Sequence, residues 1–246
     1  MPVSYESFAL AALVVACGYF IFGLSGFGAA IITVPVLSHL WPVQFVLPML
    51  SLLDLAASLS VGVRGSRQAV RSELKRMIPL ALAGAAVGVT LLVSLPREAA
   101  LASLGAFVTI YGVYSLLERG ALRTVNRGWA YPSGFIGGMT GALFGIGGPP
   151  YVIYLSRRIE DKTALRATVA TMISVSVSTR LVLFVFAGLL PWEKIITAVA
   201  LLPFAAAGVW VGGRLHARIS REWFGRAIGV LLLVTGASLL LRAMLS

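Results

Sequence analysis

The chain is poor in the side chains from which catalytic and metal centres are usually built. Among 246 residues it has one cysteine and two histidines. The lone Cys17 has no partner for an internal disulfide or for a thiolate metal site. Neither a G-x-x-x-x-G-K-[ST] phosphate loop nor an H-E-x-x-H zinc motif occurs in the sequence. We therefore expect no metal, no cofactor, no enzymatic activity and no ATP-driven pumping by this chain.

Charge is also scarce: 12% of the residues are charged, whereas 59% are apolar. Soluble domains of this length do not reach this balance, so the chain belongs in a bilayer. The net charge of +11 could suggest nucleic acid, but the basic residues stand in short loops between apolar stretches. Such a placement is an orientation signal. We therefore expect a multi-pass protein of the cell membrane, inner or plasma, with the lipid bilayer and not nucleic acid as its partner.

Eight apolar segments follow one another and leave no stretch for a separate soluble domain. They lie near residues 8–40, 43–63, 77–95, 99–117, 129–155, 167–187, 194–212 and 227–243. The first and the fifth are too long for one upright crossing, and glycine-rich sequence interrupts both in the middle. The sequence thus predicts an all-α, polytopic helical membrane protein that forms a single membrane domain over residues 1–246.

The distribution of Lys and Arg distinguishes two topologies for these segments. If all eight cross the membrane, ten basic residues lie on one side and nine on the other. If the first and fifth are hairpins that return to the side they entered from, the count is sixteen against three. The positive-inside rule favours the hairpins. We therefore expect both termini outside and cytoplasmic loops at 64–76, 118–128, 157–166 and 213–226.

The two interrupted segments resemble each other. GLSGFGAAIITVPVLS at 23–38 and FGIGGPPYVIYLS at 144–156 share a G-x-G core, small residues and then an apolar run. Three ordinary spans follow each of them, and the order of long basic loop and short loop is reversed in the second half. Paired, glycine-interrupted segments are typical of transporters built from inverted-topology repeats. We expect such repeats at 1–120 and 121–246, each with one hairpin segment plus three transmembrane helices.

The glycines of both segments would let the chain reverse at membrane depth and leave backbone N–H groups free. The first segment contains Gly26 and Gly28, and the second contains Gly145, Gly147, Gly148 and Pro149. Free N–H groups at a helix N-terminus attract anions, and proline suits the first turn of a returning half-helix. We expect these residues to bind an anionic substrate. The alternative is that the glycines only permit close helix packing.

Two charged side chains fall well inside predicted spans, Asp54 in the second and Arg180 in the sixth. An ionisable residue at that depth costs several kcal/mol unless it is paired or hydrated, which makes both residues functional candidates. Arg180 could supply positive charge to a bound anion. Asp54 could pair with Arg180 or take up a coupling proton. A purely structural ion pair is the alternative.

The motifs G-F-G-A-A-I-I-T-V-P and G-I-G-G-P-P-Y-V-I-Y-L, in a chain of this length with four segments per half, resemble the TauE/SafE family of membrane transporters. The resemblance covers essentially the whole chain. It implies export of sulfur-containing anions such as sulfite or organosulfonates, with the family-like glycines at Gly26, Gly28, Gly145, Gly147 and Gly148. Ala29 and Ala30 depart from the family pattern, in which further glycines are common.

We therefore expect a secondary anion transporter that works by alternating access, in which one bundle rocks against the other. A passive anion channel is the alternative. A third possibility is an intramembrane enzyme or assembly scaffold with Asp54 as reactive acid, although no second acid, histidine or metal cluster stands beside it. Assembly into a homo-oligomer remains open.

Overall fold

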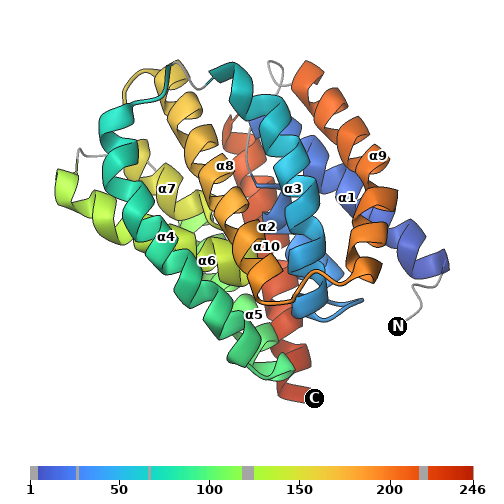
Figure 1. Ribbon diagram of the computed structural model, residues 1–246. Helices are drawn as coiled ribbons and strands as arrows, with labels where there is room; N and C mark the ends of the chain where they lie inside the picture. Colours follow the sequence, from blue (N-terminus) through green and yellow to red (C-terminus); the bar gives the residue numbers. More distant parts are fainter. Residues whose placement is uncertain (1–4, 26–27, 66–67, 118–124, 216–220, 246) are drawn as a thin grey trace. The chain divides into compact units, whose positions relative to one another are not determined.

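The computed structural model describes residues 5–25, 28–65, 68–117, 125–215 and 221–245, which are almost entirely helical (Figure 1). The helices are α1 (Tyr5–Ser25), α2 (Ala29–Leu37), α3 (Val43–Gly65), α4 (Arg71–Ser94), α5 (Arg97–Leu117), α6 (Ala130–Phe144), α7 (Gly148–Leu155), α8 (Lys162–Phe186), α9 (Trp192–Leu215) and α10 (Arg221–Leu245), with a short 3₁₀ helix, η2 (Arg127–Trp129). These ranges contain no strand. The all-α prediction is confirmed.

Five of the described helices are long and apolar enough to cross a membrane. They cover Tyr5–Leu24, Arg71–Ser94, Arg97–Leu117, Thr163–Phe186 and Trp192–Arg214. Shorter apolar stretches run over Val43–Leu59 and Leu232–Ala243. The prediction of a polytopic membrane protein is confirmed.

The chain forms two compact units, and each draws on both halves of the sequence. Unit 1 contains Met1–Leu47, Leu95–Gly120 and Val199–Ser246, and unit 2 contains Pro48–Ser94 and Ala121–Ala198. The inverted repeats, with their boundary between residues 120 and 121, stay a prediction.

Glycines let helices of unit 2 approach each other to backbone contact. A Cβ at Gly84 of α4 would overlap the carbonyl oxygen of Phe135 in α6, and a Cβ at Gly138 of α6 would overlap that of Ala81 in α4. Such contacts stabilise membrane helices, because lipid provides no hydrophobic drive for their association. At Gly84 and Gly138, glycine therefore serves close helix packing.

Unit 1 uses the same device between α1 and α9. A Cβ at Gly208 would overlap the carbonyl oxygen of Ala16, and one at Gly212 would overlap that of Phe20. Glycines also mark the contact of α5 with α10, where a Cβ at Gly112 would lie 3.2 Å from the carbonyl oxygen of Gly229. Each unit thus has at least one helix pair whose spacing tolerates no side chain at the contact.

Candidate functional site

The second glycine-rich segment breaks into two helices at Gly145. This residue ends α6 in the left-handed conformation, at φ 74°, which glycine adopts at little cost. Its N–H donates to the carbonyl of Gly141 (3.0 Å), and the N–H of Ile146 donates to that of Thr140 (3.3 Å). The bond from Gly145 to Gly141 is that of the αL cap, and both bonds satisfy carbonyls that the helix end would leave free. At the predicted break, α6 therefore ends in a hydrogen-bonded C-cap at Gly145.

The next glycines start the returning helix α7. A Cβ at Gly147 would lie 2.6 Å from the carbonyl oxygen of Gly137 and 3.1 Å from Cα of Gly141, so the two helices touch here without side chains. Gly148 is the first residue of α7, and two prolines follow it in the first turn. Proline has no N–H group, so among the first three residues of α7 only Gly148 has a backbone N–H that can donate a hydrogen bond. Pro149 can contribute to a binding site only through its shape and position.

The first glycine-rich segment is broken as well, between α1 and α2. Gly28 precedes α2 in the left-handed conformation, at φ 95°, whereas Gly26 lies outside the described residues. A Cβ at Gly18 of α1 would overlap the side chain of Thr33 in α2, so α2 packs back against α1. Gly28 belongs to unit 1, and the break at Gly145 belongs to unit 2.

Neither returning helix is long enough to cross a bilayer. The nine residues of α2 and the eight of α7 rise by roughly 14 Å and 12 Å, against about 30 Å for the hydrocarbon core. All residues of α2 except Val36 are buried, as are four of α7. Backbone that ends at membrane depth must be covered by protein or line a watery cavity, and the burial of these helices meets that condition.

Asp54 and Arg180 form an ion pair inside unit 2. Nη2 of Arg180 in α8 donates to Oδ2 of Asp54 in α3 at 2.8 Å, and Nη1 donates to the carbonyl of Gly141 at 2.6 Å. The exposed fractions are 2% for Arg180 and 8% for Asp54. The structure thus brings both charged candidates to the end of α6, where α6 meets the break.

On the third nitrogen of the Arg180 guanidinium, the Nε–H group has no hydrogen-bond partner among the described residues. A buried donor without an acceptor costs about 1–3 kcal/mol, and more when it carries charge. Removing one partner of a buried ion pair costs about 3–5 kcal/mol, so Asp54 and Arg180 depend on each other. The site therefore combines a compensated charge with a hydrogen-bond donor that the protein leaves unused.

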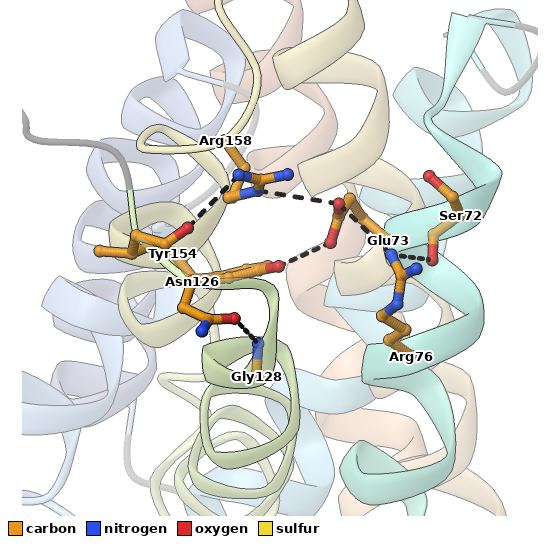
Figure 2. A network of polar contacts seen from close by, with 8 residues as sticks. Ser72, Glu73, Arg76, Asn126, Gly128, Tyr154 and Arg158 are labelled. Carbon is orange, nitrogen blue, oxygen red and sulfur yellow. Dashed lines mark hydrogen bonds and ion pairs between the residues drawn. The ribbon is translucent and has the colours of Figure 1, made fainter.

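A second buried carboxylate, that of Glu73, lies in the first turn of α4 (Figure 2). The hydroxyl of Tyr154, near the end of α7, donates to its Oε2 at 2.6 Å. Nη1 of Arg76 and Nε of Arg158 lie 3.6 Å and 3.9 Å from Oε1. Nη1 of Arg158 also donates to the carbonyl of Val125 at 3.3 Å. This network ties the C-terminal end of α7 to the start of α4.

Reasoning from the sequence did not identify Glu73, Tyr154 or Gly141. Glu73 stands among basic residues in RSELKR and was assigned to a loop, although α4 already begins at Arg71. A single acid between apolar and basic residues is a weak signal. Gly141 lies in the interrupted segment 129–155, but nothing local marks it as the residue whose carbonyl accepts from Arg180.

The serines and threonines of α8 mostly bond to their own helix, as expected for hydroxyls in membrane helices. Thr171 donates to the carbonyl of Ala167 at 2.8 Å, and Ser174 donates to that of Ala170 at 2.9 Å.

Within the described ranges, no group of three or more His, Cys, Asp or Glu side chains is arranged to hold a metal ion.

Comparison with known proteins places the chain in a family. The profile described as "Sulfite exporter TauE/SafE" matches residues 10–239. The "Probable inner membrane transporter protein TsaS" of Comamonas testosteroni is 30% identical over 195 residues, which cover 76% of this chain and 80% of that protein. The "Probable sulfite/organosulfonate exporter TauE" of Cupriavidus necator is 28% identical over 233 residues, which cover 89% and 88%. No solved structure matches. With its helical membrane-spanning fold and a match over nearly its whole length, the chain belongs to the TauE/SafE family of membrane transporters.

Proposed function

We propose that the chain is a secondary transporter that carries sulfite or a small organosulfonate across the inner membrane by alternating access. The observation that carries this proposal is the buried Arg180, whose charge is compensated by Asp54 and whose Nε–H group has no partner in the described residues. A donor of this kind beside a helix break can give a bound oxyanion a charge-assisted hydrogen bond that the described residues leave unused. The name of the Cupriavidus relative, a probable sulfite/organosulfonate exporter, supports the choice of sulfite and organosulfonates.

The helix breaks complete the proposed site. Gly145 and Gly147 bring the end of α6 and the start of α7 beside Arg180, and Gly148 offers the N–H of the first turn of α7. On the same reasoning we propose that the first glycine-rich segment, with Gly26 and Gly28, also binds an anion, through the N–H groups of Ala29 and Ala30 at the start of α2. A helix N-terminus favours negative charge through its free N–H groups and its dipole.

We propose further that the two halves, 1–120 and 121–246, are inverted repeats. The order of a long helix, a break, a short helix and three more helices occurs twice, as α1–α5 and as α6–α10. The glycine contacts support the correspondence, since the first helix of each half touches the fourth helix of the other, as α1 with α9 and α4 with α6. In alternating access, one such bundle would rock against the other around the anion.

The orientation belongs to the same proposal, with the basic loops in the cytoplasm and both termini outside. It is tested by replacing Cys17 with serine and placing single cysteines near Arg71 and near Lys162. Both should be protected from a membrane-impermeant maleimide applied to intact cells and should react in inverted vesicles. Labelling from opposite sides would rule out the hairpin topology.

Transport is tested by uptake of radiolabelled sulfite and methanesulfonate into proteoliposomes, with and without a pH gradient. We expect saturable flux that depends on the gradient through the coupling proton, with Asp54 as the candidate acceptor, and that is lost in Arg180→Ala. Arg97→Ala, at the exposed start of α5, is the matched control and should keep its flux. Flux that rises linearly with concentration would indicate a channel, and absence of flux for both anions would remove them as substrates.

A further inference from the structure

One serine of α8 differs from its neighbours in how its hydroxyl is used. Ser174 and Thr179 donate to carbonyls four residues earlier, at 2.9 Å and 2.8 Å. Among the described residues Ser176 makes no such bond, and its Oγ instead accepts from the hydroxyl of Tyr151 at 3.4 Å. This distance lies beyond the range of strong O–H···O bonds. In the described part of the chain, the Ser176 hydroxyl hydrogen therefore has no good acceptor.

Tyr151 presents the same situation from α7. Its side chain is fully buried, and its ring packs against Gly137, where a Cβ would overlap the ring atoms. Its hydroxyl meets Ser176 at the same 3.4 Å. Tyr154, one turn later on α7, shows the contrast, because its hydroxyl donates to Glu73 at 2.6 Å. A buried phenol usually has a hydrogen-bond partner, and here the one in reach is weakly placed.

Gly141 connects these hydroxyls with Arg180. Its carbonyl accepts from Nη1 of Arg180, and Oγ of Ser176 lies 3.1 Å from the position that a Cβ of Gly141 would occupy. Ser176 and Arg180 are four residues apart on α8 and so share a face of that helix. Three donors therefore belong to side chains around this glycine, namely the hydroxyls of Tyr151 and Ser176 and the Nε–H group of Arg180. Each is buried or half-buried, and none has a strong acceptor.

We propose that Tyr151 and Ser176 are specificity-determining residues that donate hydrogen bonds to separate oxygens of the transported oxoanion. The inference rests on the proposed function and adds to it. Asp54 already neutralises Arg180, so electrostatic attraction alone would bind an anion weakly and without regard to shape. Donors on two helices can bind two oxygens of one anion at the same time. They therefore favour binding of sulfite or a sulfonate, which have several oxygens, over binding of a monatomic halide.

The test compares Tyr151→Phe and Ser176→Ala with the natural sequence in the proteoliposome assay. Phenylalanine keeps the ring against Gly137, so only the hydroxyl is lost. We expect the KM for sulfite and for methanesulfonate to rise about tenfold in each variant, as for a lost hydrogen bond to a charged group, with a smaller change in maximal rate. Chloride should compete with sulfite more effectively in the variants. Ser174→Ala, whose hydroxyl is used by its own helix, should stay within about twofold.

Sulfite-dependent thermal stabilisation of the detergent-purified protein provides a readout that does not require transport. The natural sequence should be stabilised by sulfite, and the midpoint shift should shrink in both variants. Unchanged KM and unchanged stabilisation in both variants would overturn the inference while leaving an Arg180-dependent carrier in place. Stabilisation that depends on Tyr151 in the absence of flux would support the binding site and overturn the transport proposal. Neither flux nor stabilisation would overturn both.

Discussion

The two buried carboxylates of unit 2 differ in how completely the protein uses their partners. Glu73 lies at the start of α4, where the positive end of the helix dipole favours a carboxylate, and it receives a short bond from Tyr154. Its two arginines are more exposed, at 32% and 22% of their side chains. Asp54 lies in mid-helix beside an arginine that is almost fully buried and keeps one donor unpaired. Glu73 therefore anchors α7, whereas Arg180 keeps the donor that our proposal assigns to the anion.

Asp54→Asn should have the largest effect, because it leaves the buried charge of Arg180 uncompensated. We expect a loss of about 3–5 kcal/mol in the free energy of unfolding and no sulfite flux. The double variant Asp54→Asn with Arg180→Gln, which buries no net charge, should recover part of the stability but none of the flux. The measurement is reversible unfolding in mixed micelles alongside proteoliposome uptake. A single variant as stable as the natural protein would contradict the dependence of the two residues on each other.

Glu73→Gln should have an intermediate effect, confined to stability. The amide keeps an oxygen that can accept from Tyr154 but loses the charge that faces Arg76 and Arg158. Because both arginines can reach water, we expect a loss of about 1–2 kcal/mol in the free energy of unfolding. Sulfite flux per folded molecule should stay within about threefold. A loss of flux as complete as that of Arg180→Ala would show that the Glu73 network takes part in transport and would break the comparison.

Tyr154→Phe should have the smallest effect. The ring and its packing remain, and one hydrogen bond to Glu73 is removed at an expected cost of about 1–2 kcal/mol, at or below that of Glu73→Gln. The KM for sulfite should not move, in contrast to Tyr151→Phe on the same helix. Measuring both tyrosine variants in one series sharpens the distinction, since a shared KM defect would indicate displacement of α7 instead of a direct contact.

Much of the fold could be predicted because a local run of apolar residues is enough to identify a membrane helix. The interrupted segments 8–40 and 129–155 correspond to α1 with α2 and α6 with α7, and the glycines identify the second break. The start of α4 was less predictable. Its first turn, from Arg71, is basic and resembles a loop, yet it is helical and buries Glu73.

The candidate site could be predicted only in part. Asp54 and Arg180 stood out because charge at membrane depth is rare, and their depth in the two spans is a local property. The contacts of Arg180 with Gly141 and of Tyr151 with Ser176 depend on how α6 and α7 pack against α8. That register is set by residue sizes along whole helix faces, and no short motif records it.

The backbone contacts between α4 and α6 have a consequence for movement. The carbonyl oxygens of Phe135 and Ala81 occupy notches left by Gly84 and Gly138, so sliding either helix by one residue would drive a side chain into the opposing backbone. Packed interfaces of this kind change by discrete steps and do not deform gradually. We therefore expect α4 and α6 to move together as one rigid element, so that a rearrangement at the proposed anion site would carry both helices with it.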